Sequence, residues 1–170
     1  NYENMVYVNQ NSLNLFFGDT EQLTASPTES TFEWTSEDPS VATVNNKGLV
    51  TATGDGNTQI SITQGEWTQR VDVTVSLPTS KEVLARAGNK RVLIEVTIDN
   101  EKVQKMNVEC NNNDSSIEED VNYKSGVFKF YYDDLEENKK YDFTVTCIDR
   151  YGNQSKPINV SANVYGESFQ

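Results

Sequence analysis

The stretch WTSEDPSVATVNNKGLVTATGDG, residues 34–56, decides the fold of the first half of the chain. It holds two short runs rich in valine and alanine, at 41–44 and 49–52, separated by an Asn-Asn pair and Gly48 and preceded by Pro39. Asn, Gly and Pro are turn-forming residues, so the pattern predicts brief strands joined by turns. The apolar residues lack helical spacing, and we therefore expect an all-β fold.

The same pattern continues on both sides of this stretch. Apolar residues recur at every second position, the period of a strand with one buried face: Leu13 and Leu15, Leu23 and Ala25, Ile60 and Ile62, and Val71, Val73 and Val75. Gly65 and Glu66 separate the last two runs, which suits a hairpin turn. We expect Trp34 to lie in the core, because its strand normally supplies the core tryptophan of such sandwiches.

Four of these segments also carry a family resemblance. The Trp-Thr-Ser strand at 34–36, the Val-Ala-Thr-Val run at 41–44, the Asn-Asn turn and the Gly-Leu-Val-Thr-Ala run at 48–52 resemble the group 2 bacterial immunoglobulin-like family. The resemblance extends from about Val6 to Val75, and it implies an immunoglobulin-like β-sandwich.

A change of pattern follows at Leu77-Pro78-Thr79-Ser80. Because Pro78 cannot donate a ladder hydrogen bond, we place a domain boundary there and expect two domains, residues 1–77 and 78–170. Alternation then resumes in a second set of runs: Val92 to Ile98, Met106 to Cys110, Val127 to Tyr132, Tyr141 to Cys147, and Ile158 to Val164. These runs predict a second sandwich, so that the fold class is two tandem immunoglobulin-like or fibronectin type III-like sandwiches.

Leu135 is followed six residues later by Tyr141, a spacing that resembles the tyrosine corner of fibronectin type III domains. In that corner the phenol bonds the backbone of the preceding loop while the ring fills the core. The second half resembles an uncharacterised Bacteroidetes surface-lipoprotein family of fibronectin type III-like shape. The resemblance rests on residues 87–92, 135–153 and 164–166. This resemblance implies an outer-membrane-tethered lipoprotein of a polysaccharide-utilisation system, and it implies no site residues.

Charge and composition exclude several functions. The net charge of -12 and pI near 4.4 disfavour nucleic acid and anionic membrane surfaces as partners. Without histidine, a Ser-His-Asp triad is impossible, and we expect no enzyme, cofactor or metal site. Carboxylates are numerous, but we expect them to be solvated rather than paired across a catalytic cleft: Glu118, Glu119, Asp120, Asp133, Asp134, Glu136 and Glu137. They could hold Ca²⁺, although the loop spacing of an EF-hand is missing.

Cys110 and Cys147 fall on two inward-facing runs that are neighbouring strands in this fold, so we expect the two side chains to lie close together. Two alternatives follow. They form a disulfide, which an exported protein permits, or they remain buried free thiols that act as small hydrophobes.

Exposed aromatic rings are the candidates for contact with a sugar, because a flat ring packs against the C–H groups of a pyranose. Trp67, beside the Gly65 hairpin, is the first of them, with a cap on the sandwich end or an interdomain contact as its structural alternatives. Tyr131 and Tyr151 are the others, since one tyrosine of the 131/132 pair points outward and Tyr151 lies at a loop tip.

We therefore expect a noncatalytic, extracellular surface module that serves adhesion or glycan binding. One alternative is a rigid spacer that presents another domain, and a second is an adhesin that binds a cell-surface protein. We expect a monomer that reaches a membrane only through a signal or lipid anchor preceding Asn1.

Overall fold

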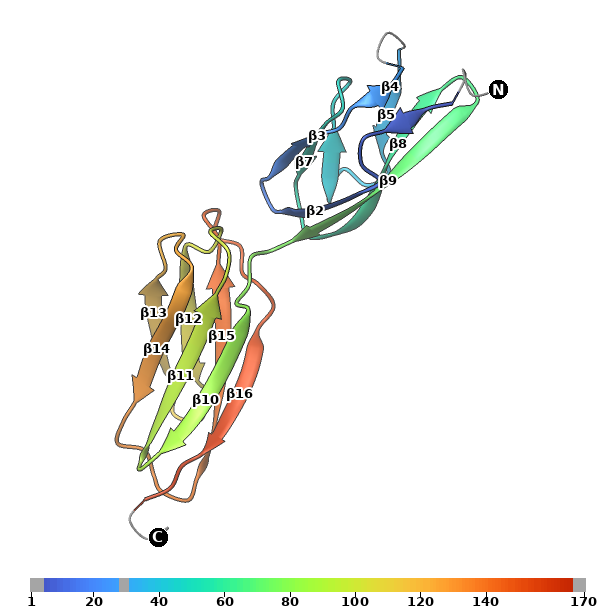
Figure 1. Cartoon of the computed structure of the whole chain (residues 1–170). Helices are drawn as coiled ribbons and strands as arrows, with labels where there is room; N and C mark the ends of the chain where they lie inside the picture. Colours follow the sequence, from blue (N-terminus) through green and yellow to red (C-terminus); the bar gives the residue numbers. More distant parts are fainter. Residues whose placement is uncertain (1–4, 28–30, 167–170) are drawn as a thin grey trace. The chain divides into compact units, whose positions relative to one another are not determined.

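The computed structural model describes residues 5–27 and 31–166, and within them it contains strands and turns with no helix (Figure 1). The chain divides into two units, residues 1–77 and 78–170. The all-β tandem expected from period-two burial is confirmed. No helix that could cross a membrane occurs in the described part of the chain.

The first unit is a sandwich of short strands. Its main layers are a four-stranded sheet in the order β2-β9-β8-β5 and a three-stranded sheet in the order β3-β7-β6, and a small β1-β4 pair completes it. β2 runs parallel to β9, and the other pairs are antiparallel. The strands are β1 (Tyr7–Val8), β2 (Ser12–Phe16), β3 (Thr20–Gln22), β4 (Ala25–Ser26), β5 (Glu33–Ser36), β6 (Ala42–Val44), β7 (Leu49–Ala52), β8 (Gly56–Gln64) and β9 (Trp67–Ser76).

Trp34 and Gly48 form one close contact of this unit. The Trp34 ring packs against the core but remains half-buried, so it is less enclosed than the sequence pattern predicted. Gly48 has φ +84°, and a Cβ there would lie 2.8 Å from the indole ring and 2.7 Å from the carbonyl oxygen of Leu23. Only glycine fits this turn, because both the conformation and the lack of space exclude a side chain.

The second unit has the strand order of a fibronectin type III sandwich. A three-stranded sheet, β10-β11-β14, faces a four-stranded sheet, β13-β12-β15-β16 (Figure 1). Alternate residues of β11, β12 and β15 are buried and fill the space between the two sheets. The strands are β10 (Glu82–Gly88), β11 (Arg91–Ile98), β12 (Lys105–Cys110), β13 (Ser115–Asp120), β14 (Gly126–Tyr132), β15 (Lys140–Ile148) and β16 (Ile158–Asn163).

Leu135 and Tyr141 make the corner that their spacing suggested. Both side chains are buried, and the backbone N–H of Glu136 donates to the Tyr141 hydroxyl at 3.0 Å. The phenol thus ties the loop before β15 to the strand that it enters, while its ring contributes to the core.

The expectation that Cys110 and Cys147 lie close together is wrong. They do occupy paired strands, but Cys110 is opposite Phe143 and Cys147 is opposite Met106. An offset of four residues separates the two along the sheet by about 14 Å. A disulfide requires Cα atoms within about 7 Å, so both residues are buried free thiols.

Candidate functional site

The three aromatic residues predicted to contact a ligand lie on three different elements. Trp67 is the first residue of β9 in the first unit and is 40% exposed, whereas Tyr131 on β14 and Tyr151 in the turn after β15 are 50% and 57% exposed. The Arg91 guanidinium lies 5.1 Å from the centre of the Tyr131 ring, and that of Arg150 lies 5.9 Å from the centre of the Tyr151 ring. Each tyrosine ring is therefore exposed and lies beside an arginine.

A larger group of polar side chains lies on the outer face of the four-stranded sheet in the second unit. Because side chains alternate along a strand, the burial of Met106, Val108 and Cys110 turns their neighbours outward. Pairing then arranges the outward side chains in three rows across the strands: Asp120, Lys105 and Ile148; Glu118, Asn107 and Thr146; and Ser116, Glu109, Thr144 and Asn159. We call these three rows the polar face.

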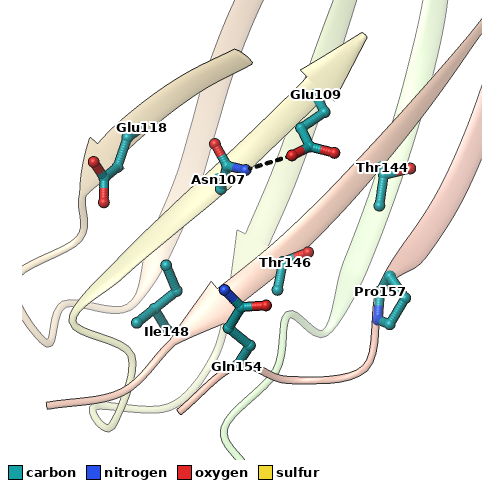
Figure 2. Close-up of a pocket in the computed structure, with 8 residues that line it drawn as sticks. All are labelled: Asn107, Glu109, Glu118, Thr144, Thr146, Ile148, Gln154 and Pro157. Atoms are coloured by element: carbon teal, nitrogen blue, oxygen red, sulfur yellow. Dashed lines mark hydrogen bonds between the residues drawn. The ribbon is translucent and has the colours of Figure 1, made fainter. Parts of the chain in front are cut away.

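The polar face encloses a shallow depression of about 510 Å³ (Figure 2). Amide, carboxylate and hydroxyl groups surround its centre, and apolar groups from Ile148 and Pro157 lie beside them. Its walls come from β12, β13, β15 and the loop that precedes β16: Asn107, Glu109, Glu118, Thr144, Thr146, Ile148, Gln154 and Pro157. The depression thus offers both hydrogen-bonding groups and a small apolar surface.

Hydrogen bonds hold several of these side chains in place. The Asn107 amide donates to Glu109 at 3.1 Å, a bond drawn as a dashed line in Figure 2. The Thr144 hydroxyl donates to Asn159 at 2.8 Å and accepts a bond from the Asn111 amide at 2.9 Å. These bonds orient the side chains before any ligand arrives, and each group keeps further donor or acceptor positions open.

The electrostatics of the polar face are acidic. Lys105 lies 2.9 Å from Glu118, and the hydrogen bond to that carboxylate raises the pKa of Lys105 above its ordinary value. The ammonium is therefore engaged within the face, while Glu109 and Asp120 add two further carboxylates. Both glutamates are exposed to solvent.

The carboxylates of the polar face and the thiol of Cys147 lie in different environments. Glu109 and Glu118 lie on an open sheet surface, where solvent reaches both carboxylates. Burial raises the pKa of the Cys147 thiol to about 11, so at neutral pH it is protonated and a poor nucleophile. Across residues 5–27 and 31–166, no group of His, Cys, Asp and Glu side chains could hold a metal ion.

The carboxylates noted in the sequence are distributed around the second unit rather than gathered. Asp133 pairs with Arg91 at 2.9 Å, and Glu136 lies 3.6 Å from Lys139, both on the surface. The signal that sequence reasoning missed was instead a set of Asn, Thr and Glu residues at alternate positions of β12 and β15. Taken alone, each strand has the pattern of an ordinary sandwich strand with one buried face and one solvated face.

Comparison with known proteins identifies both halves of the chain. The model of the bacterial Ig-like domain (group 2) matches residues 4–75, and that of DUF4998, a domain of unknown function, matches residues 77–170. No curated protein matches the sequence.

Solved structures resemble the chain in fold at low identity. Domains 4 and 5 of the S-layer protein SbsC are 17% identical, with 85% of this chain and 82% of that chain covered and a TM-score of 0.37. The FN1–FN3 domains of chicken CNTN1 are 10% identical, with coverages of 89% and 63% and a TM-score of 0.38. A β-1,2-glucanase from Parabacteroides distasonis is 18% identical, with coverages of 72% and 19% and a TM-score of 0.35.

Likeness at this level describes the arrangement of strands and carries no argument about activity. The family match, by contrast, extends over more than half of the chain. The chain belongs to the DUF4998 family through residues 77–170, and a group 2 bacterial Ig-like domain precedes that domain.

Proposed function

We propose that this chain is a noncatalytic module of an extracellular bacterial surface protein and that it binds carbohydrate on the polar face of its second unit. The group 2 bacterial Ig-like match and the acidic composition support a surface location. An outer-membrane lipoprotein that takes part in polysaccharide utilisation is the setting we propose, with the module acting as a monomer.

The observation that carries this proposal is the chemistry of the depression on the polar face. Sugars present hydroxyl groups that bond amides and carboxylates, and C–H groups that prefer an apolar surface. Asn107, Glu109 and Thr146 offer the first kind of contact, and Ile148 with Pro157 offers the second. Most of these residues lie on paired strands, so the protein loses little conformational entropy when it binds a ligand.

A binding role accounts for the openness of the site better than a catalytic role does. An open face admits a polymer along its length without requiring a chain end, which suits binding of a polysaccharide. The exposed position of Glu109 and Glu118 supports recognition of hydroxyl groups and gives neither residue the environment of a general acid.

Affinity gel electrophoresis of the full chain tests the proposal. Xyloglucan, arabinoxylan, laminarin and galactomannan serve as immobile ligands, and retardation by at least one of them is the expected result. Asn107→Ala combined with Thr146→Val should weaken that retardation about tenfold or more, because two oriented hydrogen-bonding groups are lost. Trp67→Ala and Tyr131→Ala are matched controls on other surfaces.

Two results contradict the proposal. One is the absence of retardation by every polysaccharide, and the other is retardation that the double variant leaves unchanged. If Trp67→Ala or Tyr131→Ala abolishes retardation instead, the binding site lies at an exposed aromatic residue rather than on the polar face.

A spacer role is the second candidate, and the connection between β9 and β10 favours it. Pro78 and Ser80 are buried, the N–H of Lys81 donates to the Thr97 carbonyl at 2.8 Å, and the Asn100 amide donates to the Thr79 carbonyl at 3.1 Å. A connection that is tied down in this way suits a stalk. A folded protein that binds none of the polysaccharides would support this role.

A further inference from the structure

We infer that the carbohydrate held on the polar face is an uncharged chain of several sugar residues lying along β12 and β13, rather than a single sugar. This inference depends on the proposed function. It follows from the length of the hollowed surface, from the spacing of its polar groups and from its charge.

The depression on the polar face does not end at Glu109. A second depression of about 270 Å³ begins at the same residue and continues to the turn that joins β12 to β13. Its lining is again polar, with Asn111, Asp114, Ser115 and Ser116 around the backbone of Cys110. Glu109 lines both depressions, so they adjoin on β12, and we call the two together the trough.

The trough is several times longer than a single sugar ring. From the row of Lys105 to the turn at Asn111 it follows six residues of extended chain, which is about 20 Å at the rise of a β-strand. The Cα atoms of Asn107 and Glu109 lie about 7 Å apart on β12, and Asn111 follows in the turn after the strand, so hydrogen-bonding side chains recur at every second residue. A ligand with repeating hydroxyl groups matches such a series, whereas one sugar would use only part of it.

The charge of the trough selects among polysaccharides. Glu109, Glu118 and Asp114 contribute carboxylates along its length. The ammonium of Lys105 at one end is bonded to Glu118 and is not directed at a ligand. A chain with uronic acid or sulfate groups would meet like charge here, so the trough fits a neutral polymer.

Isothermal titration calorimetry of the full chain with oligosaccharides of one to six units tests this inference. Xylo-, cello- and laminari-oligosaccharides are the neutral probes, and oligogalacturonates are the anionic counterpart. We expect affinity for a neutral series to rise at least tenfold between two and five units, and we expect no detectable binding of the oligogalacturonates.

Two variants connect the length dependence to the trough. Ser116→Ala removes an exposed hydroxyl from the second depression, so it should weaken binding of the five-unit oligosaccharides more than binding of the disaccharide. Glu109→Gln alters the residue that lines both depressions and should weaken binding at every length. Ser161→Ala, an exposed residue of the same sheet outside the trough, is the matched control and should have no effect.

The possible outcomes separate this inference from the function on which it depends. Equal affinity for two and for five units would overturn the extended chain while leaving carbohydrate binding in place. Tighter binding of oligogalacturonates than of neutral oligosaccharides would overturn the selection by charge. If no oligosaccharide binds and the polysaccharides are not retarded in gels, the proposed function itself fails.

Discussion

Replacing Tyr141 by phenylalanine removes one hydroxyl group from the second unit and leaves the ring in its core. The hydroxyl accepts the N–H of Glu136 at 3.0 Å in a partly buried position, so the substitution leaves that donor without its partner. Losing one such bond costs about 1 to 3 kcal/mol of stability. Because water can reach the loop at Glu136, we expect the lower half of this range, about 1 to 1.5 kcal/mol.

The chain offers a separate reporter for each unit. Both tryptophans, Trp34 and Trp67, lie in residues 1–77, and both cysteines lie in residues 78–170 as buried free thiols. Tryptophan fluorescence therefore follows unfolding of the first unit in urea, while pulse labelling of the thiols follows unfolding of the second. With a slope of about 1 to 1.5 kcal/mol per molar urea, the thiol-detected midpoint of Tyr141→Phe should fall by roughly 1 M.

The tryptophan-detected midpoint of the same variant should remain that of the parent protein. Tyr131→Phe is the matched control, because the Tyr131 ring is half exposed on a neighbouring sheet and losing its hydroxyl should move neither midpoint. A thiol-detected shift below about 0.3 M would refute the structural role of the Tyr141 hydroxyl. Equal shifts in both signals would refute the division into two independently folded domains at Leu77 and Pro78.

Three further predictions concern the core of each unit. Cys110 and Cys147 should react with a thiol reagent only after unfolding, with two equivalents released, and a reductant should leave the melting temperature unchanged; a reductant-dependent melting temperature would indicate a disulfide. Gly48→Ala should destabilise the first unit by about 2 kcal/mol or more and shift the Trp34 emission, because the added Cβ meets the indole ring at a positive φ. Burial raises the pKa of Cys147 to about 11 and that of Tyr132 to about 12, so the unfolded chain releases these protons first. Stability of the second unit should therefore be complete below about pH 9 and fall as the pH rises toward 12, and a flat thiol-detected urea midpoint across that range would contradict it.

The parts of the fold that the sequence predicted well have strong alternation. β8, β9, β11 and β15 each bury every second residue along much of their length, and the hairpin at Gly65 joins two of them. β10 and β13 were not predicted, because neither contains a fully buried residue and their apolar alternation is therefore weak.

The two cysteines show where the sequence pattern stops being sufficient. Their strands were correctly expected to be neighbours, but the registers of Cys110 with Phe143 and of Cys147 with Met106 place the thiols apart. The polar face was missed for the same reason. Asn107, Glu109 and Thr146 are ordinary outward residues of separate strands until pairing aligns them in rows.

The sequence by itself determined that this chain folds as successive β-sandwiches, because alternation of apolar residues is a local property that each strand carries independently. It also determined that histidine-dependent chemistry is excluded, because composition alone settles that. Only the tertiary structure decided which side chains share a surface, since strand register depends on contacts between segments distant in the sequence. The trough along β12 and β13 and the separation of Cys110 from Cys147 both follow from that register.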